Sequence, residues 1–364
     1  MSTFADFYSP PDGNPKSTLF LTSVKNIISY DYSSRFAEPG EFTMVIPLNN
    51  ELLQLIAKDV IIDYDGDSLI IEDYSYDAGS GILTVKGTDL KGLTRRRVCV
   101  PYYDGQADTF GYDVVEGNTK QCVQHYVSRN LDTPEDTERA LPVIFNADSI
   151  TGINDHYMAK GEYLSETIAK LLNNAGLGYV MNLLPSGYIE FKLLAGVDRS
   201  MGQTSIPRVV FCDTWKNTEI EHFEHASSNL INAVYASGAG IVSVVYPTET
   251  APESFSRRET YIEVGADTVS EIPILALEAI KDNIESHSFS VTPISEGYGS
   301  LYKMGDYVSV RDPHIGTIYN GQITGITKSY TADGKKLSLT IGKEKPKFLN
   351  RIINNVLNGT QQRR

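Results

Sequence analysis

The sequence predicts a mainly β protein of the α+β class, with two similar small antiparallel β-barrels, an inserted α+β middle domain and a discontinuous chain path. A pattern of three short strands at residues 59–87 returns at residues 306–342, and the clearest helical periodicity of the chain lies between the two copies. Because only two copies occur and they stand far apart, they predict one small barrel used twice rather than a solenoid.

The first copy has three runs of β-forming residues with turn residues between them. Asp65-Gly66 is a typical hairpin turn, and residues 78–81 supply a second turn. The expected strands are Val60–Asp63, Leu69–Tyr76 and Ile82–Lys86.

The second copy keeps the same order of strands and turns. If one structure is used twice, Ile70 and Ile71 occupy the places of Gln322 and Ile323 or of their immediate neighbours. The expected strands are Tyr307–Arg311, Gln322–Tyr330 and Leu337–Ile341, with turn residues at 316, 320–321 and 332–334.

Residues 18–98 are expected to form the first barrel, preceded by an irregular arm at residues 1–17 that contains three prolines. Strands are expected over Thr18–Tyr32 and around the alternating residues 42–46, and a short helix is expected to begin at Asn49-Asn50.

Residues 99–206, together with 239–299, are expected to form the middle domain. Helical periodicity predicts helices over 118–129, over Glu162–Asn174 with a stop at Gly176, and over 274–286. A hairpin is expected across Pro185-Ser186-Gly187.

Residues 207–238, together with 300–346, are expected to form the second barrel. The first strands of this barrel must then come from residues 209–237. Residues 248–258 are polar and predict a loop. Residues 347–364 are expected to form a C-terminal helix, over Phe348–Leu357, and a basic tail; this helix is a candidate docking element.

The composition excludes several classes of protein. The chain has 364 residues, of which 41% are hydrophobic, and no run is long enough to cross a membrane; its N-terminus does not resemble a secretory signal. With 46 acidic and 32 basic residues, the net charge of −14 opposes general nucleic-acid binding. Cys99, Cys122 and Cys212 have neither disulfide nor zinc spacing, so we expect them to be buried apolar residues.

Several segments resemble the tail-hub family of long-tailed bacteriophages. They are SSRFAEPGEFTMVIP at 33–47, DGDSLIIED at 65–73 with LTVKGTDLKGLTRRR at 83–97, and KMGDYVSV at 303–310. The resemblance implies a homotrimeric ring of the tail tip or baseplate that joins the tail tube to the tip or spike and lines the DNA channel.

That resemblance also implies the partners and the location. The partners would be the tail tube protein, the distal tail protein, tip, spike or receptor-binding proteins and the tape-measure protein, in a virion tail assembled in the host cytoplasm. The alternative is a tail-tip enzyme or carbohydrate-binding protein that acts on the host envelope. Since the sequence ends soon after the second barrel, we expect no lytic domain and no enzyme.

Four motifs suggest chemistry, and each has a simpler structural interpretation. Arg95-Arg96-Arg97 could bind phosphate, but edge or subunit contacts are commoner. His222 and His225 lie in a strand context that places them on opposite faces, which opposes a metal site. Asp63, Asp65 and Asp67 lack the calcium-loop register, and Gly238-Ala239-Gly240 has too few glycines for a dinucleotide loop.

His125, on an expected helix, reads as a partly buried structural residue. No nucleophile elbow, phosphate-binding loop or paired Cys/His motif is present in the sequence. The sequence therefore predicts no catalytic, cofactor-binding or metal-binding residue, and no cofactor.

Overall fold

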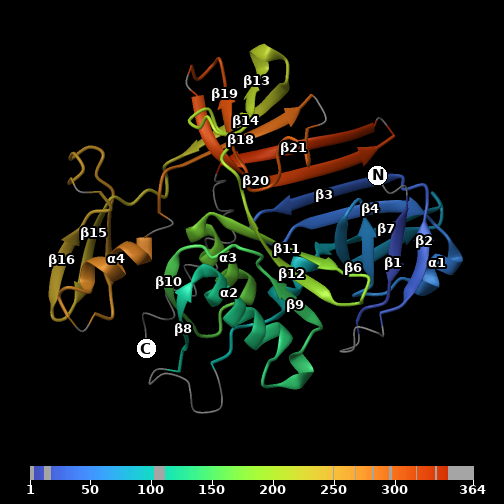
Figure 1. Ribbon diagram of the computed structural model, residues 1–364, viewed down its shortest axis with the longest axis horizontal. Coiled ribbons are helices and arrows are strands. Elements are labelled where there is room, and N and C mark those ends of the chain that lie inside the picture. The colour runs from blue at the N-terminus through green and yellow to red at the C-terminus, as the bar shows by residue number, and fades with distance from the viewer. Residues whose placement is uncertain are drawn as a thin grey trace. The chain divides into compact units, whose positions relative to one another are not determined.

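The computed structural model describes residues 4–11, 18–101, 111–248, 250–266, 268–280, 283–294, 297–316, 318–332 and 334–342 (Figure 1). They divide into two compact units, one within Met1–Glu221 and Ser290–Ile341 and the other within His222–Phe289. The fold is mainly β with several sheets and few helices, which confirms the predicted class.

Five strands of the N-terminal part form the first copy of a repeated sheet. They lie in the sheet in the order β3-β4-β7-β6-β5, and the short helix α1 (Asn50–Leu55) connects β4 to β5. The Asn49 side chain accepts a hydrogen bond of 2.8 Å from Glu51 N and so caps α1, as the sequence predicts. The strands are β3 (Ser29–Arg35), β4 (Glu41–Pro47), β5 (Ile61–Tyr64), β6 (Asp67–Asp77) and β7 (Ile82–Asp89).

Five later strands form the second copy. They follow the same order in the chain and the same order in the sheet, β14-β18-β21-β20-β19. The short strand β13 (Val210–Cys212) lies beside β19. The strands are β14 (Thr218–Ala226), β18 (Ser286–Pro293), β19 (Tyr307–Arg311), β20 (Ile318–Thr331) and β21 (Gly334–Gly342).

The pairing registers of the two copies match. The register shifts in the β6–β7 pair between Ile71 and Asp73, and in the β20–β21 pair between Ile323 and Gly325. A β-bulge therefore lies at the same place in both copies. The predicted repeat, with Ile70-Ile71 in the places of Gln322-Ile323, is confirmed in strand order, direction and register.

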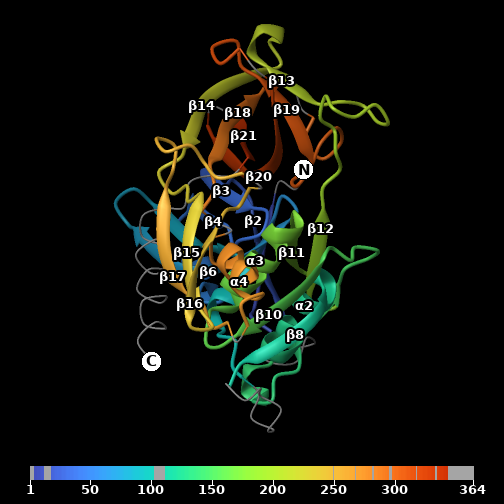
Figure 2. The ribbon, with the colours of Figure 1, turned by 90° about the vertical axis from the view of Figure 1, so that its left-hand side faces the viewer.

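The two copies are joined through β3 and β20, which pair antiparallel and lie side by side in Figure 1 and Figure 2. The result is one 13-stranded sheet whose main path runs from β14 to β2. Among the described strands neither copy closes into a barrel, because the second half of β20 pairs with the other copy. The two closed barrels expected from the sequence are therefore not found in this part of the chain.

The start of the chain differs from the expected irregular arm. β1 (Ala5–Tyr8) pairs with both β5 and β2 (Phe20–Val24), because its alternating Ala5 and Phe7 are buried while Asp6 and Tyr8 stay partly exposed. The expected C-terminal helix at 348–357 lies outside the described residues.

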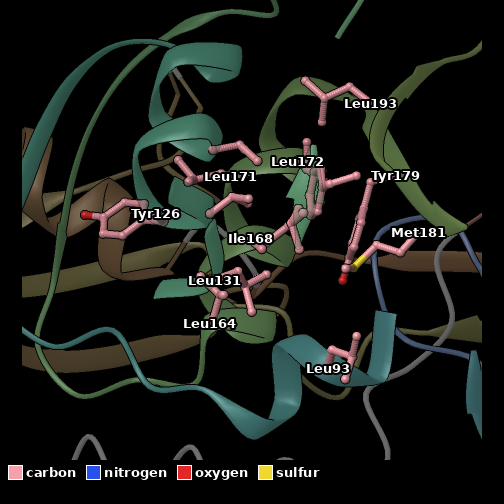
Figure 3. Packing of buried hydrophobic residues seen from close by; sticks show 14 of the residues in the cluster. Leu93, Tyr126, Leu131, Leu164, Ile168, Leu171, Leu172, Tyr179, Met181 and Leu193 are labelled. Atoms are coloured by element: carbon pink, nitrogen blue, oxygen red, sulfur yellow. The ribbon is translucent and has the colours of Figure 1, made fainter. Parts of the chain in front are cut away.

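The region between the two copies contains helices α2 (Thr119–Val127) and α3 (Leu164–Ala175) on small sheets, as predicted. Gly176, at φ 64°, ends α3 in the left-handed conformation. Figure 3 shows the core between α3 and its sheet, where Ile168, Leu172 and Tyr179 pack together. The strands are β8 (Asp113–Asn118), β9 (Val143–Asn146), β10 (Asn154–Ala159), β11 (Leu177–Leu183) and β12 (Ile189–Ala195). The described part of the chain also contains short 3₁₀ or π turns at Leu90–Arg96, Ser128–Asp132, Thr137–Arg139 and Asp213–Trp215.

Residues 227–285 form an insertion between β14 and β18, where the first copy has only residues 36–40 between β3 and β4. Within it, α4 (Ile272–Ile280) packs against a sheet of order β16-β15-β17 through Val234, Ala236 and Ala276. The strands are β15 (Ala233–Gly238), β16 (Ile241–Val245) and β17 (Glu259–Glu263). The sequence assigned 239–299 to the middle domain, whereas these residues build the separate insertion and β18. The insertion has an apolar core of its own, and this core explains why it does not belong to the expected middle domain.

Candidate functional site

The joint between the two copies is the first part of the candidate site. Six residue pairs form it, from Gly325 opposite Arg35 to Tyr330 opposite Tyr30. Ser329 Oγ donates a 2.7 Å hydrogen bond to Asp31 Oδ1 across the joint. Lys328 Nζ lies 5.9 Å from the centroid of the Tyr32 ring. The joint therefore combines a backbone ladder with cross-strand side-chain contacts.

Lys328 also ties the joint to the turn between β5 and β6. Its Nζ pairs with Asp67 Oδ2 and lies 3.7 Å from Asp65 Oδ2. Burial raises the pKa of Asp67, and the Lys328 ammonium opposes that shift. Asp65 and Gly66, at φ 53° and 81°, form the hairpin turn predicted from the sequence, and Asp65 and Asp67 contact a lysine there.

A buried ion pair lies at the edge of the joint, and no motif in the sequence predicts it. Lys91 Nζ is 3.4 Å from Asp89 Oδ2 and donates a 2.5 Å hydrogen bond to Arg35 O at the end of β3. Asp89 Oδ2 also accepts 3.0 Å hydrogen bonds from Tyr32 Oη and Gly40 N. The sequence signal was a lysine between Leu90 and Leu93, a place where a solvated side chain is unexpected.

Burial acts on both members of this pair and opposes their charged forms. It raises the pKa of Asp89 and lowers the pKa of Lys91, while each charge opposes the shift of the other. The pair fixes the end of β3 against β7, and so holds in place the strand on which the joint depends.

The second part of the candidate site is a strand edge on β6. β5 pairs only with residues Asp67 to Ile70 of β6, so residues 72–77 have β7 on one side and no described strand on the other. All six of these residues are exposed. In β20 the corresponding stretch pairs with β3.

The third part is the outer edge of β14. β14 has the place in the second copy that β3 has in the first, and among the described strands it has a hydrogen-bonded neighbour, β18, on one side only. Unpaired backbone N–H and C=O groups on a strand edge are a template for another strand. The chain therefore has two strand edges without a described neighbour, on β6 and on β14. They are equivalent to the edges of β20 and β3 that pair with each other.

Each arginine of the run at 95–97 contacts an acidic side chain or a backbone carbonyl of this chain. Arg95 Nη1 lies 3.7 Å from Glu41, and Arg96 pairs with Asp59 and, at 3.3 Å, with Glu72. Arg97 donates two hydrogen bonds to Arg139 O. This arrangement favours the structural interpretation of the run over phosphate binding.

The histidine strand does not bring His222 and His225 together. His225 Nε2 instead donates a 2.8 Å hydrogen bond to Glu285 Oε1. Its ring stacks on His287, with the ring centroids 4.5 Å apart and the planes 3° from parallel. Parallel rings direct their nitrogen lone pairs side by side rather than toward one point. Among the described residues no group of three or more His, Cys, Asp or Glu has a metal-binding arrangement; that this strand binds no metal stays a prediction.

The remaining motifs have structural roles. His125 is partly buried, as predicted, 2.8 Å from the buried Asp113, which Arg129 also contacts at 2.6 Å. Ala239 and Gly240 have positive φ and form the turn between β15 and β16. The three cysteines are free and buried, as predicted.

An open hollow of about 280 Å³ lies beside the second copy. Its lining includes Phe211, Trp215 and Tyr302. In the described part of the chain, no helix is long and apolar enough to span a membrane.

Comparison with known proteins places this geometry in a family. The model of the Siphovirus ReqiPepy6 Gp37-like protein family matches residues 16–343. The chain belongs to this family. No curated protein is a significant match to the sequence.

Solved structures of phage tail proteins share the fold of this Gp37-like chain. The tail protein from Neisseria meningitidis MC58 has a TM-score of 0.56 at 16% identity, covering 93% of this chain and 97% of its own. The 43 kDa tail protein of prophage MuSo2 from Shewanella oneidensis gives 0.56 at 14%, with the same coverage. Prophage tail protein gp18 from Listeria monocytogenes EGD-e gives 0.53 at 15%, covering 97% and 98%. The resemblance to phage tail proteins inferred from the sequence is confirmed.

Proposed function

We propose that the chain is a structural subunit of the tail tip or baseplate of a phage or a phage-tail-like particle. In this role it forms a homotrimeric ring that joins the tail tube to the tip or spike and lines the DNA channel. Its partners are the tail tube and distal tail proteins on one side, and tip, spike or receptor-binding proteins and the tape-measure protein on the other.

The matched repeat carries this proposal. Each chain has two five-stranded copies with the same chain order, sheet order and bulge position. Three chains would place six similar units around one axis. A part with three chains could then seat on a tube with six-fold symmetry, and a closed ring would leave no free strand edge at the joints.

The charge of the chain supports the proposed channel. A surplus of 46 acidic over 32 basic residues gives little long-range attraction for phosphate, so a wall built from this chain would let DNA pass without holding it. The local pairing of Arg95, Arg96 and Arg97 points the same way.

The alternative is an enzyme or carbohydrate-binding protein of the tail tip. The aromatic hollow around Trp215 is the feature that would serve sugar binding, since sugars stack on aromatic faces. A peptidoglycan-clearing assay and a glycan-binding assay with purified full-length chain separate the two roles. The structural proposal expects no clearing and no saturable binding; clearing that survives a heat-inactivated control would favour the enzyme.

The location is tested in assembled particles. The proposal expects the chain at the layer between the tube and the tip, as three copies. Its absence from purified tails, or its presence in the capsid alone, would overturn the proposal.

A further inference from the structure

We propose that residues 72–77 of β6 pair with β14 of a second copy of this chain, and so repeat between chains the β20–β3 joint found within the chain. This inference rests on the proposed ring and names the contact that builds it.

β6 and β20 are equivalent strands of the two copies. Asp59 N donates to Ile71 O at 2.8 Å and Ile71 N donates to Val60 O at 2.9 Å. In the second copy, Gly305 N donates to Ile323 O at 2.8 Å and Ile323 N donates to Asp306 O at 2.9 Å. Ile71 and Ile323 are thus equivalent, and residues 72–77 correspond to the stretch that follows Ile323.

That stretch of β20 has a known partner. Residues 325–330 pair antiparallel with residues 30–35 of β3, directly after the bulge. Residues 73–77 of β6 also follow the bulge, and their outer edge has no strand beside it in the described part of the chain. The β6 edge is therefore equivalent to the β20 side of the joint, but no described strand takes the place of β3 beside it.

The missing strand corresponds to β14. β3 lies next to β4 in the first copy, and β14 lies next to β18 in the second; β4 and β18 each lie next to the third meander strand, β7 or β21. β3 uses its other edge for β20, whereas β14 ends the main path of the sheet. One chain thus offers both halves of a joint, but on strands of different copies that are not neighbours in its sheet.

Two complementary halves on different copies make a head-to-tail contact between chains. Such contacts give a closed ring when the rotations from one copy to the next add up to a full turn. Around this ring, the β20–β3 joint within each chain then alternates with the β6–β14 joint between chains. A second copy of this chain is the partner that already carries the matching strand, so no other protein is needed to cover either edge.

Acidic side chains on both edges oppose association of isolated chains at low salt. Residues 72–77 include Asp73 and Asp77 besides Glu72, which Arg96 pairs. β14 includes Glu219 and Glu224 besides Glu221, which Lys336 pairs. Like charges on facing strands oppose pairing, and added salt screens them. Association through these edges should therefore become stronger as ionic strength rises, the reverse of a joint made by opposite charges.

Hydrogen exchange tests the joint directly. Amide exchange is compared between the free full-length chain at low salt and the same chain in purified tails. We expect residues 72–77 and 218–226 to exchange about tenfold or more slowly in tails, because paired edge amides open less often. Residues 325–330 serve as the internal control, since they are already paired with β3 in the free chain and should change little.

A matched pair of variants tests the contact through charge. Tyr76 and Phe20 are each 58% exposed on strand edges, but only Tyr76 lies on the proposed joint. Tyr76→Glu should weaken association roughly threefold per joint and Tyr76→Lys should strengthen it by a similar factor. Phe20→Glu and Phe20→Lys should leave association unchanged. Sedimentation over a salt series gives the association constants, and circular dichroism shows whether each variant is folded.

The outcomes separate this inference from the proposed function. If the chain is present in tails as three copies but residues 72–77 exchange as fast as in the free chain, the joint is wrong and the ring stands. Protection of 72–77 without protection of β14 would also overturn the joint. If tails do not contain the chain, the proposed function fails first.

Discussion

Ile71 and Ile323 occupy one position in two copies of the same sheet. Each lies just before a β-bulge. Each donates its N–H to, and accepts a backbone hydrogen bond from, the two residues that precede β5 or β19. Such agreement in register over a meander is not expected from unrelated strands, because a bulge changes which face every later side chain occupies. The duplication therefore organises the chain.

The buried lysine should be essential for stability. Lys91→Met removes the charge that faces Asp89 and should lower the free energy of unfolding by about 3 kcal/mol, because an unpaired carboxylate remains in the core. Lys86→Ala, at an exposed position of β7, should cost less than about 0.5 kcal/mol. Urea unfolding measures both; equal losses would contradict the structural role of the pair.

The same variant should change the dependence of stability on pH. Without Lys91, only the hydrogen bonds from Gly40 and Tyr32 oppose burial, which raises the pKa of Asp89 in the folded state above that in the unfolded chain. A carboxyl group of this kind favours the folded state at low pH, and that contribution is lost as pH rises through the raised pKa. Lys91→Met should therefore be less stable at pH 8 than at pH 5, relative to the parent chain, and a difference of the opposite sign would exclude this explanation.

Gly178 is required where β11 crosses the turn after β3. A Cβ atom there would lie 2.3 Å from the Phe36 ring and 2.4 Å from Phe36 O, and Tyr179 N donates to that same oxygen at 3.0 Å. Gly178→Ala should destabilise the chain by about 2 kcal/mol through overpacking. Gly79→Ala, in an exposed turn with only the Asp77 side chain nearby, is the control. A thermal unfolding midpoint for Gly178→Ala no lower than the control's would refute this contact.

Cys99 should resist alkylation in the folded protein. Burial raises its pKa to about 12, so almost no thiolate forms at pH 8. Mass spectrometry after iodoacetamide treatment should find Cys99 unmodified in the native chain and modified in urea. Rapid labelling under native conditions would show that this core opens.

The chain should not be retained on duplex DNA at physiological salt. The net charge of −14 and the local pairing of the arginine run both oppose phosphate binding. Retention that weakens steeply as salt rises would contradict this, because such a slope reports phosphate neutralised by basic side chains.

The sequence predicted the parts of the fold that depend on local pattern. The two meanders, the cap at Asn49, the stop at Gly176 and the turn at Asp65-Gly66 follow from turn chemistry and periodicity.

The contacts that join distant segments could not be read in the same way. Nothing local in Arg35 and Gly325 indicates that they face each other across the sheet joint. Likewise the insertion at 227–285 was misassigned, because a core of Val234 and Ala276 becomes visible only when strand and helix meet. Lys91 stands between Leu90 and Leu93, which hints at burial, but its partners Asp89 and Arg35 O come together only in the fold.

The symmetry of the assembled tail at the layer of this chain tests the central claim most directly. A particle map should show three copies, with six similar sheets around the axis and two kinds of strand joint in alternation, β20 with β3 inside each chain and β6 with β14 between chains. Any symmetry other than three-fold at this layer would contradict the ring.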